Sequence, residues 1–98
     1  MSYRFVAALW RYQGEAAWFF VTVPHDVADD IEEITAPTRK GFGSVPVEVT
    51  LGGSRWRTSL FPDSKMESYV LPVKQAIRRA EGITDGDLVT LEIRLVAD

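Results

Sequence analysis

The amino-acid sequence predicts a mainly β fold, a six-stranded barrel with two short helices. Segments in which apolar and polar residues alternate recur along the chain, as expected for strands with one buried face. Two of these segments are joined by Gly52 and Gly53, a two-residue glycine turn typical of β-hairpins. Proline directly follows a predicted strand at Pro24 and again at Pro72, and a helical spacing of apolar residues comes next each time.

The strands are predicted from alternation and from β-branched and aromatic residues. In segment 45–51, Val45, Val47, Val49 and Leu51 share one face, whereas Glu48 and Thr50 share the other. Segment 88–96 repeats this pattern, with Val89, Leu91, Ile93 and Leu95 on the inward face. The six strands are expected at residues 3–12, 16–23, 45–51, 54–61, 68–71 and 88–96.

Each helix is expected to begin at its proline and to present one apolar stripe to the barrel. The predicted inward residues are Val27, Ala28, Ile31 and Ile34 in the first helix, and Val73, Ala76, Ile77 and Ala80 in the second. Gly82 follows the second stripe and is expected to cap that helix.

The chain of 98 residues has room for one domain, 1–98, and its halves 1–51 and 52–98 are weakly similar. Each half reads strand, strand, proline, helix, loop, strand. The first half carries a longer loop within residues 35–44, which contains Pro37 and Gly41. An internal duplication would produce a pseudo-twofold barrel with its helices at opposite ends.

Composition favours a cytoplasmic location without a membrane anchor. There is no cysteine, so the hydrophobic core must hold the fold, as is common in a reducing compartment. Neither a signal-peptide pattern nor an apolar run long enough to span a bilayer is visible. The net charge of −3 argues against non-specific attraction to nucleic acid.

Residues 71–93 resemble the swapped-hairpin module of AbrB-like and MazE-like regulators. They share a proline-led helix that ends near glycine, a Gly-Asp turn at Gly86 and Asp87, and an alternating apolar strand. Nearly the whole chain resembles the bacterial DUF1905 family of small double-split β-barrels. The segments that carry this second resemblance are 5–9, 18–24, 45–47, 56–62 and 71–93. It implies a fold, but neither an activity nor catalytic residues, because the family has no assigned function.

The residues offer little support for a metal site or for catalysis. His25 is the only histidine, and the nearby Asp26, Asp29 and Asp30 are interpreted as a solvated helix surface. Ser59 and Ser68 belong to the half that lacks the histidine, so no nucleophile and base can be paired. No catalytic residue, metal ligand or cofactor is therefore predicted, and the sequence favours a binding module over an enzyme.

The candidate site is a basic cluster in the second half. Lys74 and Arg78 are one helical turn apart, while Arg55 and Arg57 share a strand face opposite Trp56. If the helix packs near that strand, these cations can converge on a small anionic molecule or an acidic protein segment. The alternative for the cluster is ordinary surface pairing with Glu48, Glu67, Glu81 or Glu92. The alternative functions are an AbrB-like nucleic-acid-binding regulator and an enzyme of unknown class.

Aromatic residues and charge suggest further surfaces. The first two strands, with Trp10 and Trp18, are apolar on both faces, which predicts a covered face, an interface or a groove. The first helix is acidic and the second basic, so copies can associate head to tail, and a monomer or a weak homodimer is expected. Arg39 and Lys40, in a glycine-rich connector, are two more cations within reach of an anion.

Overall fold

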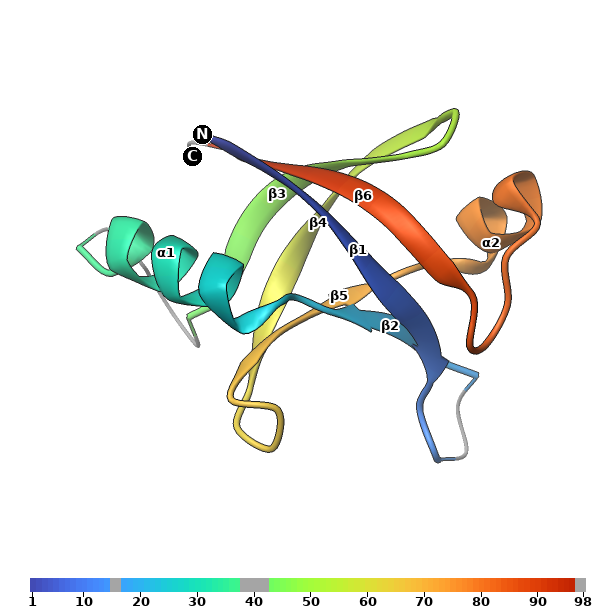
Figure 1. Cartoon of the computed structure of the whole chain (residues 1–98), viewed down its shortest axis with the longest axis horizontal. Coiled ribbons are helices and arrows are strands. Elements are labelled where there is room, and N and C mark those ends of the chain that lie inside the picture. Colours follow the sequence, from blue (N-terminus) through green and yellow to red (C-terminus); the bar gives the residue numbers. More distant parts are fainter. Residues whose placement is uncertain (15–16, 38–42, 97–98) are drawn as a thin grey trace.

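The computed structural model describes residues 1–14, 17–37 and 43–96, and these form a closed barrel of six antiparallel strands flanked by two helices (Figure 1). The prediction of a six-stranded barrel with two helices is confirmed. The strands are β1 (Ser2–Arg11), β2 (Phe19–Thr22), β3 (Val45–Leu51), β4 (Ser54–Asp63), β5 (Ser68–Pro72) and β6 (Leu88–Leu95). The helices are α1 (His25–Thr35) and α2 (Gln75–Glu81).

The order of strands around the barrel is β1-β2-β5-β4-β3-β6. Exchanging the two halves, so that β1 replaces β4, β2 replaces β5 and β3 replaces β6, reproduces the same set of neighbours. The pairing therefore has the twofold topology that an internal duplication would produce, and a duplicated origin of halves 1–51 and 52–98 remains our prediction.

The barrel interior is filled by the alternate residues of the strands. Val47 and Val49 of β3 pair with strands on both sides and are fully buried, as is Ile93 of β6. Burying a side chain of this size stabilises the fold by about 1.5–3 kcal/mol. Glu48 and Thr50 face outward, as the alternation predicted.

Helix α1 begins after Pro24 and contributes Ala28 and Ile31 to the core. The prediction that Ile34 faces inward is wrong, because its side chain is 39% exposed. Figure 1 shows the reason: the helix runs outward from the barrel, so its last turn lies beyond the strands that its first turns cover.

Helix α2 begins at Gln75, later than the proline-led start that was expected. Val73 is not helical; its N–H donates to the carbonyl of Phe19 at 2.9 Å, so it continues the pairing of β2 with β5. Only Ile77 of this seven-residue helix is buried. The prediction that Ala76 and Ala80 face inward is wrong: both are exposed, because the short helix covers the barrel only at Ile77. Gly82 ends the helix with φ of +64°, as predicted.

The second strand was expected to start at residue 16, but β2 starts at Phe19, and residues 15–16 lie outside the described part of the chain. The cations Arg39 and Lys40 also lie outside it. Within the described residues, no helix is long and apolar enough to cross a membrane.

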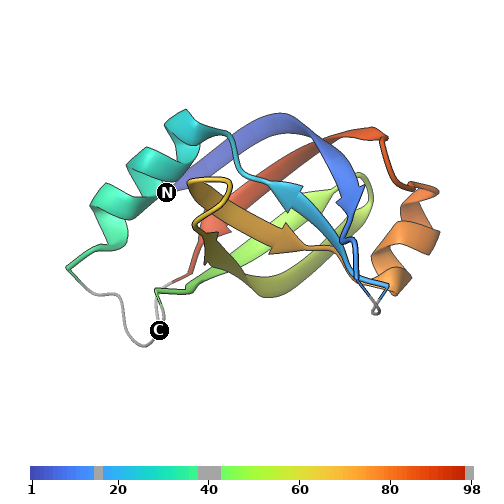
Figure 2. The same cartoon turned by 90° about the horizontal axis from the view of Figure 1, so that it is seen from below.

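The two helices lie at opposite ends of the long axis of the molecule (Figures 1 and 2), which measures 37 Å. Helix α1 carries Asp26, Asp29, Asp30, Glu32 and Glu33 and neither lysine nor arginine. The α2 end carries Arg78 and Arg79 in its last turn and Lys74 at its N-cap. The two helices therefore differ in charge: α1 is acidic, whereas α2 with its N-cap carries three cations and one carboxylate, that of Glu81.

Candidate anion-binding pocket

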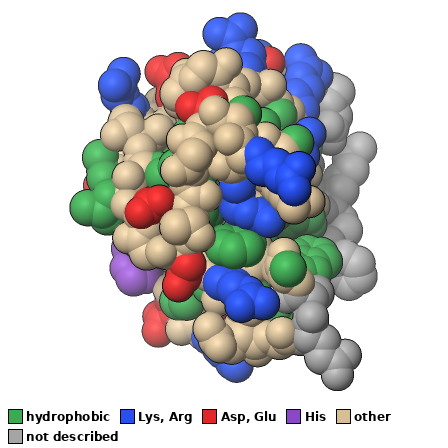
Figure 3. Space-filling view, turned by 90° about the vertical axis from the view of Figure 1, so that its right-hand side faces the viewer, with side chains coloured by type: hydrophobic (Ala, Val, Ile, Leu, Met, Phe, Trp, Pro, Cys, Tyr) green, Lys and Arg blue, Asp and Glu red, His purple; other side chains and the backbone are tan. Residues whose placement is uncertain are grey.

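A pocket of about 400 Å³ lies at the α2 end of the barrel, where β2, β4 and the segment linking β5 to α2 meet. We call it the basic pocket. Figure 3 shows this end of the molecule, where Lys and Arg side chains gather around a hydrophobic surface. The residues that line it are Ala17, Trp18, Phe19, Trp56, Arg57, Thr58, Pro72, Val73, Lys74, Gln75 and Arg78. This set contains three cations and no carboxylate.

Arg78 is the most firmly held of these cations. Its Nη1 donates to the carbonyl oxygen of Val73 at 2.6 Å, and its guanidinium carbon lies 3.9 Å from the centre of the Phe19 ring. The backbone is extended at Lys74, the N-cap of α2, so the carbonyl of Val73 lies outside the helix. Burial lowers the pKa of the Arg78 guanidinium below its usual value, because a less hydrated site disfavours the charged form.

Lys74 and Arg57 are exposed at the margin of the basic pocket. Lys74 forms no ion pair with any residue that the structure describes. Arg57 has one distant acidic neighbour, since its Nε lies 4.0 Å from Oε2 of Glu48 while its side chain is 69% exposed. Exposed pairs of this kind contribute about 0–1 kcal/mol, so Arg57 is free to bind another anion.

The expected convergence of four cations is therefore found for three of them. Arg55 lies outside the basic pocket, opposite Thr50 of β3, and lines a separate hollow with Glu48, Glu92 and Arg94. The reason is geometric, because residues two apart on a strand are separated by about 7 Å along it. Trp56 is buried and forms an inner wall of the basic pocket, on the strand face opposite Arg57.

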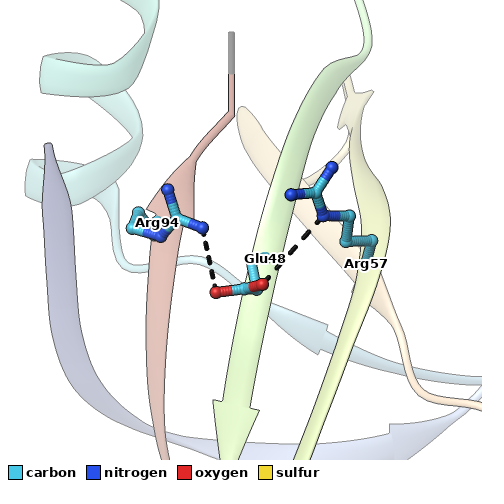
Figure 4. A network of polar contacts seen from close by, with 3 residues as sticks. All are labelled: Glu48, Arg57 and Arg94. Carbon is cyan, nitrogen blue, oxygen red and sulfur yellow. Dashed lines mark hydrogen bonds and ion pairs between the residues drawn. The ribbon is translucent and has the colours of Figure 1, made fainter.

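Surface pairing, the alternative for the basic cluster, is found for Arg57, which pairs with Glu48, but not for Lys74 or Arg78 within the described residues. Figure 4 shows Glu48 between Arg94 and Arg57 on neighbouring strands. Arg94 donates from Nη2 to Oε1 of Glu48 at 3.0 Å. Glu81 instead accepts hydrogen bonds from the hydroxyl of Ser54 at 2.6 Å and from the N–H of Gly53 at 3.3 Å. Neither carboxylate thus neutralises Lys74 or Arg78.

Three residues that line the basic pocket were not predicted from the sequence as site residues: Phe19, Thr58 and Gln75. Phe19 belongs to a strand that is apolar on both faces, and that pattern was the only signal available. Thr58 and Gln75 are ordinary polar residues whose place in the pocket depends on how β4 and α2 pack.

His25 has a structural contact, and its acidic neighbours form no metal site within the described residues. His25 Nε2 lies 2.8 Å from the carbonyl oxygen of Met66, and this hydrogen bond joins the start of α1 to the turn between β4 and β5. Across residues 1–14, 17–37 and 43–96, no three His, Cys, Asp or Glu side chains are grouped so that they could hold a metal ion.

Comparison with known proteins identifies the family. The family model described as "Domain of unknown function (DUF1905)" matches residues 5–93. The chain belongs to the DUF1905 family. Comparison with curated proteins finds no match.

In this DUF1905 domain, the basic pocket combines charged donors with a partly apolar wall. Arg57, Lys74 and Arg78 can donate to phosphate or carboxylate oxygens, and Thr58 and Gln75 can add neutral hydrogen bonds. Phe19 and Trp56 supply the apolar wall. A few polar groups over an aromatic surface are typical of small-molecule sites.

Proposed function

We propose that this domain binds a small anionic ligand, carrying a phosphate or carboxylate group, in the basic pocket. The observation that supports this most strongly is the arrangement of Arg57, Lys74 and Arg78. They come from two separate segments, β4 and the start of α2, they line one pocket, and no acidic residue in the described part of the chain lines it with them.

The environment of Arg78 favours binding further. Charge-assisted hydrogen bonds are about twice as strong as neutral ones, and guanidinium groups match phosphate and carboxylate oxygens in geometry. Phe19 and Val73 hold the Arg78 side chain in place. An anion therefore meets a cation that loses little conformational freedom on binding.

The size and chemistry of the basic pocket favour a small ligand over an acidic protein segment. Its volume of about 400 Å³ lies within the range of small-molecule sites, which is about 300–1,000 Å³. Among the residues that the structure describes, the pocket lining includes no imidazole and no carboxylate, the groups that most often transfer protons in enzymes. This set of residues supports binding rather than catalysis.

The test is calorimetric titration of the domain at low salt with inorganic phosphate, sulfate and citrate. We expect saturable binding, and we expect Arg57→Gln and Lys74→Gln each to weaken it about tenfold by removing one charge-assisted contact. The matched controls are Arg55→Gln, on the same strand face as Arg57, and Arg79→Gln, adjacent to Arg78 on α2. Both controls remove a positive charge that does not line the basic pocket.

Two results would overturn the proposal. One is the absence of binding to all three anions at millimolar concentration. The other is an equal loss in the control variants, which would indicate general electrostatic attraction instead of a site. Titration with duplex DNA tests the AbrB-like alternative, which requires binding that weakens steeply with salt.

A further inference from the structure

Trp18 lines the basic pocket and also a second hollow on the outer surface of β1 and β2. We call this second hollow the aromatic groove. Its volume is about 600 Å³, and it is lined by Trp10, Arg11, Tyr12, Gln13, Trp18, Phe20, Asp63, Lys65, Met66 and Val70. Because Trp18 lines both hollows, a ligand held by the pocket cations is within reach of this residue.

The rings of the aromatic groove are held against one another. Phe20 stacks with Trp18 at a centroid distance of 5.9 Å, is tilted against Trp10 at 5.2 Å, and meets Tyr12 edge-on at 6.5 Å. Trp10 is fixed further by its Nε1, which donates to Oγ1 of Thr22 at 2.9 Å. Trp18 is nevertheless 55% exposed, so a rigid support leaves much of its indole open to solvent.

An open, supported indole is a stacking surface for a planar ring. Aromatic side chains and nucleobases attract one another through stacking whatever the identity of the base. The charged residues nearby indicate which chemical group the planar ring of the ligand carries. Arg57, Lys74 and Arg78 line the basic pocket. Arg11 and Lys65 line the aromatic groove with one carboxylate, that of Asp63, which accepts hydrogen bonds from the backbone N–H groups of Lys65 and Met66. An anionic group next to the ring would complement this charge.

We propose that the ligand of this domain carries a planar aromatic ring attached to an anionic group, and that its chemical class is the nucleoside monophosphates. The phosphate occupies the basic pocket and the base stacks on Trp18 towards the aromatic groove. This inference rests on the proposed function, because it requires the pocket cations to hold the anion.

The experiment compares ligands that contain the ring, the anion or both. Titrations of the wild-type domain with AMP, UMP and phenyl phosphate are compared with titrations with inorganic phosphate and adenosine. We expect the three aromatic phosphates to bind about tenfold more tightly than inorganic phosphate, which is the gain that one stacked base typically supplies. Adenosine is expected to bind more weakly than AMP by at least the same factor.

Variants of the stacking ring locate the effect. Trp18→Ala is expected to remove the tenfold gain while leaving the affinity for inorganic phosphate unchanged, and Trp18→Phe is expected to restore most of the gain. Circular dichroism and urea unfolding establish that each variant is folded. The matched control is Phe61→Ala, which removes an exposed ring on β4 that lines neither hollow.

The outcomes separate this inference from the proposed function. If inorganic phosphate binds through Arg57 and Lys74 but the aromatic phosphates bind no more tightly, this inference is overturned and the proposed function stands. If no anion binds, both fail. If a ten-nucleotide single strand binds far more tightly than AMP, with affinity that falls steeply with salt, the occupant is a nucleic acid and the proposed class is wrong.

Discussion

The guanidinium carbon of Arg78 lies 3.9 Å from the centre of the Phe19 ring, and the same guanidinium donates to the carbonyl of Val73 at 2.6 Å. These contacts attach α2 to both β2 and the end of β5. Arg78 therefore has a structural role in addition to its proposed role in binding.

We predict that Arg78→Ala lowers the free energy of unfolding by about 1–3 kcal/mol. A partly buried cation–π contact contributes about 0.5–2 kcal/mol, and a hydrogen bond from a charged group contributes about 1.5–3 kcal/mol, less the solvation that the side chain regains. Urea denaturation followed by fluorescence measures the change. Arg79→Ala on the neighbouring exposed position is the control, and its expected effect is below about 0.5 kcal/mol. Equal effects of the two variants would mean that the contacts to Phe19 and Val73 contribute nothing.

The glycines of the β3–β4 turn differ in what they tolerate. Gly52 has φ of +58°, and a Cβ at this position would lie 1.9 Å from Oε1 of Glu81. At Gly53 the nearest atom would be 4.0 Å away. The carboxylate of Glu81 is held there by hydrogen bonds from Ser54 and Gly53, so it must give up those bonds to make room at Gly52.

Gly52→Ala is therefore expected to destabilise the domain by about 1–3 kcal/mol, and Gly53→Ala by less than about 1 kcal/mol. Thermal and urea unfolding of the two variants provide the comparison. In a Glu81→Ala background the cost of Gly52→Ala should fall, because the collision is gone and only the left-handed backbone remains unfavourable. An unchanged cost in that background would show that Glu81 plays no part.

The alternation of residues was sufficient to predict the barrel strands, because side chains on a strand point to opposite faces whatever the neighbouring strands are. Val47, Val49, Leu91 and Ile93 were all placed inward and are all buried. The buried residues of the helices were predicted less well, because the spacing of apolar residues does not indicate how much of each helix lies over the barrel. Ile34 and Ala76 satisfy the helical spacing and yet are exposed.

For the candidate site, the sequence predicted that Lys74 and Arg78 lie one helical turn apart. It did not predict how far α2 lies from each end of β4. That distance depends on where the helix starts, and the extended backbone at Lys74 places the start at Gln75. The basic pocket consequently includes Arg57 and excludes Arg55. The role of Trp18 in both hollows was beyond prediction, because it depends on the packing of rings around Phe20.

A hydrogen bond between Tyr3 and Asp30 connects β1 to α1. From it we predict a loss of stability at alkaline pH. The Tyr3 hydroxyl donates to Oδ2 of Asp30 at 2.5 Å. Burial, followed by the hydrogen bond and the charge of Asp30, raises the pKa of Tyr3 from 10.0 to about 12. The folded state therefore holds the phenolic proton more tightly than the unfolded chain does. The resulting stability is fully present below pH 10 and is lost as the pH rises from 10 towards 12.

Tyr3→Phe has no phenolic proton and is the comparison for this effect. We expect the wild-type domain to be more stable than the variant at neutral pH by about 1 kcal/mol, through the hydrogen bond. This difference should shrink between pH 10 and 12. Urea unfolding at a series of pH values measures it, and the comparison cancels the titration of lysines, which both proteins share. A difference that stays constant across this range would contradict the assigned proton linkage.

For Glu48 we predict the opposite pH dependence, a loss of folding stability at acidic pH. Its hydrogen bond with Arg94 is the largest cause that lowers the pKa of Glu48 below its usual value of 4.5, with smaller contributions from the charges of Arg94, Arg55 and Arg57. A carboxyl with a lowered pKa stabilises the fold above pH 4.5, and that contribution is lost as the pH falls through the lower folded value. Nuclear magnetic resonance titration of the side-chain carboxyl carbon measures the pKa directly.

Among single substitutions of the neighbouring arginines, Arg94→Gln is expected to raise the pKa of Glu48 most, because it removes both the hydrogen bond and a charge. Arg57→Gln should raise it less, since its Nε is 4.0 Å away and the pair is exposed to solvent. High salt should reduce the effect of Arg57 more than that of Arg94, whose direct hydrogen bond at 3.0 Å is screened less. If Arg57→Gln shifted Glu48 as far as Arg94→Gln, Arg57 would be bound to the carboxylate in solution. An anion in the basic pocket would then have to compete with Glu48 for that guanidinium.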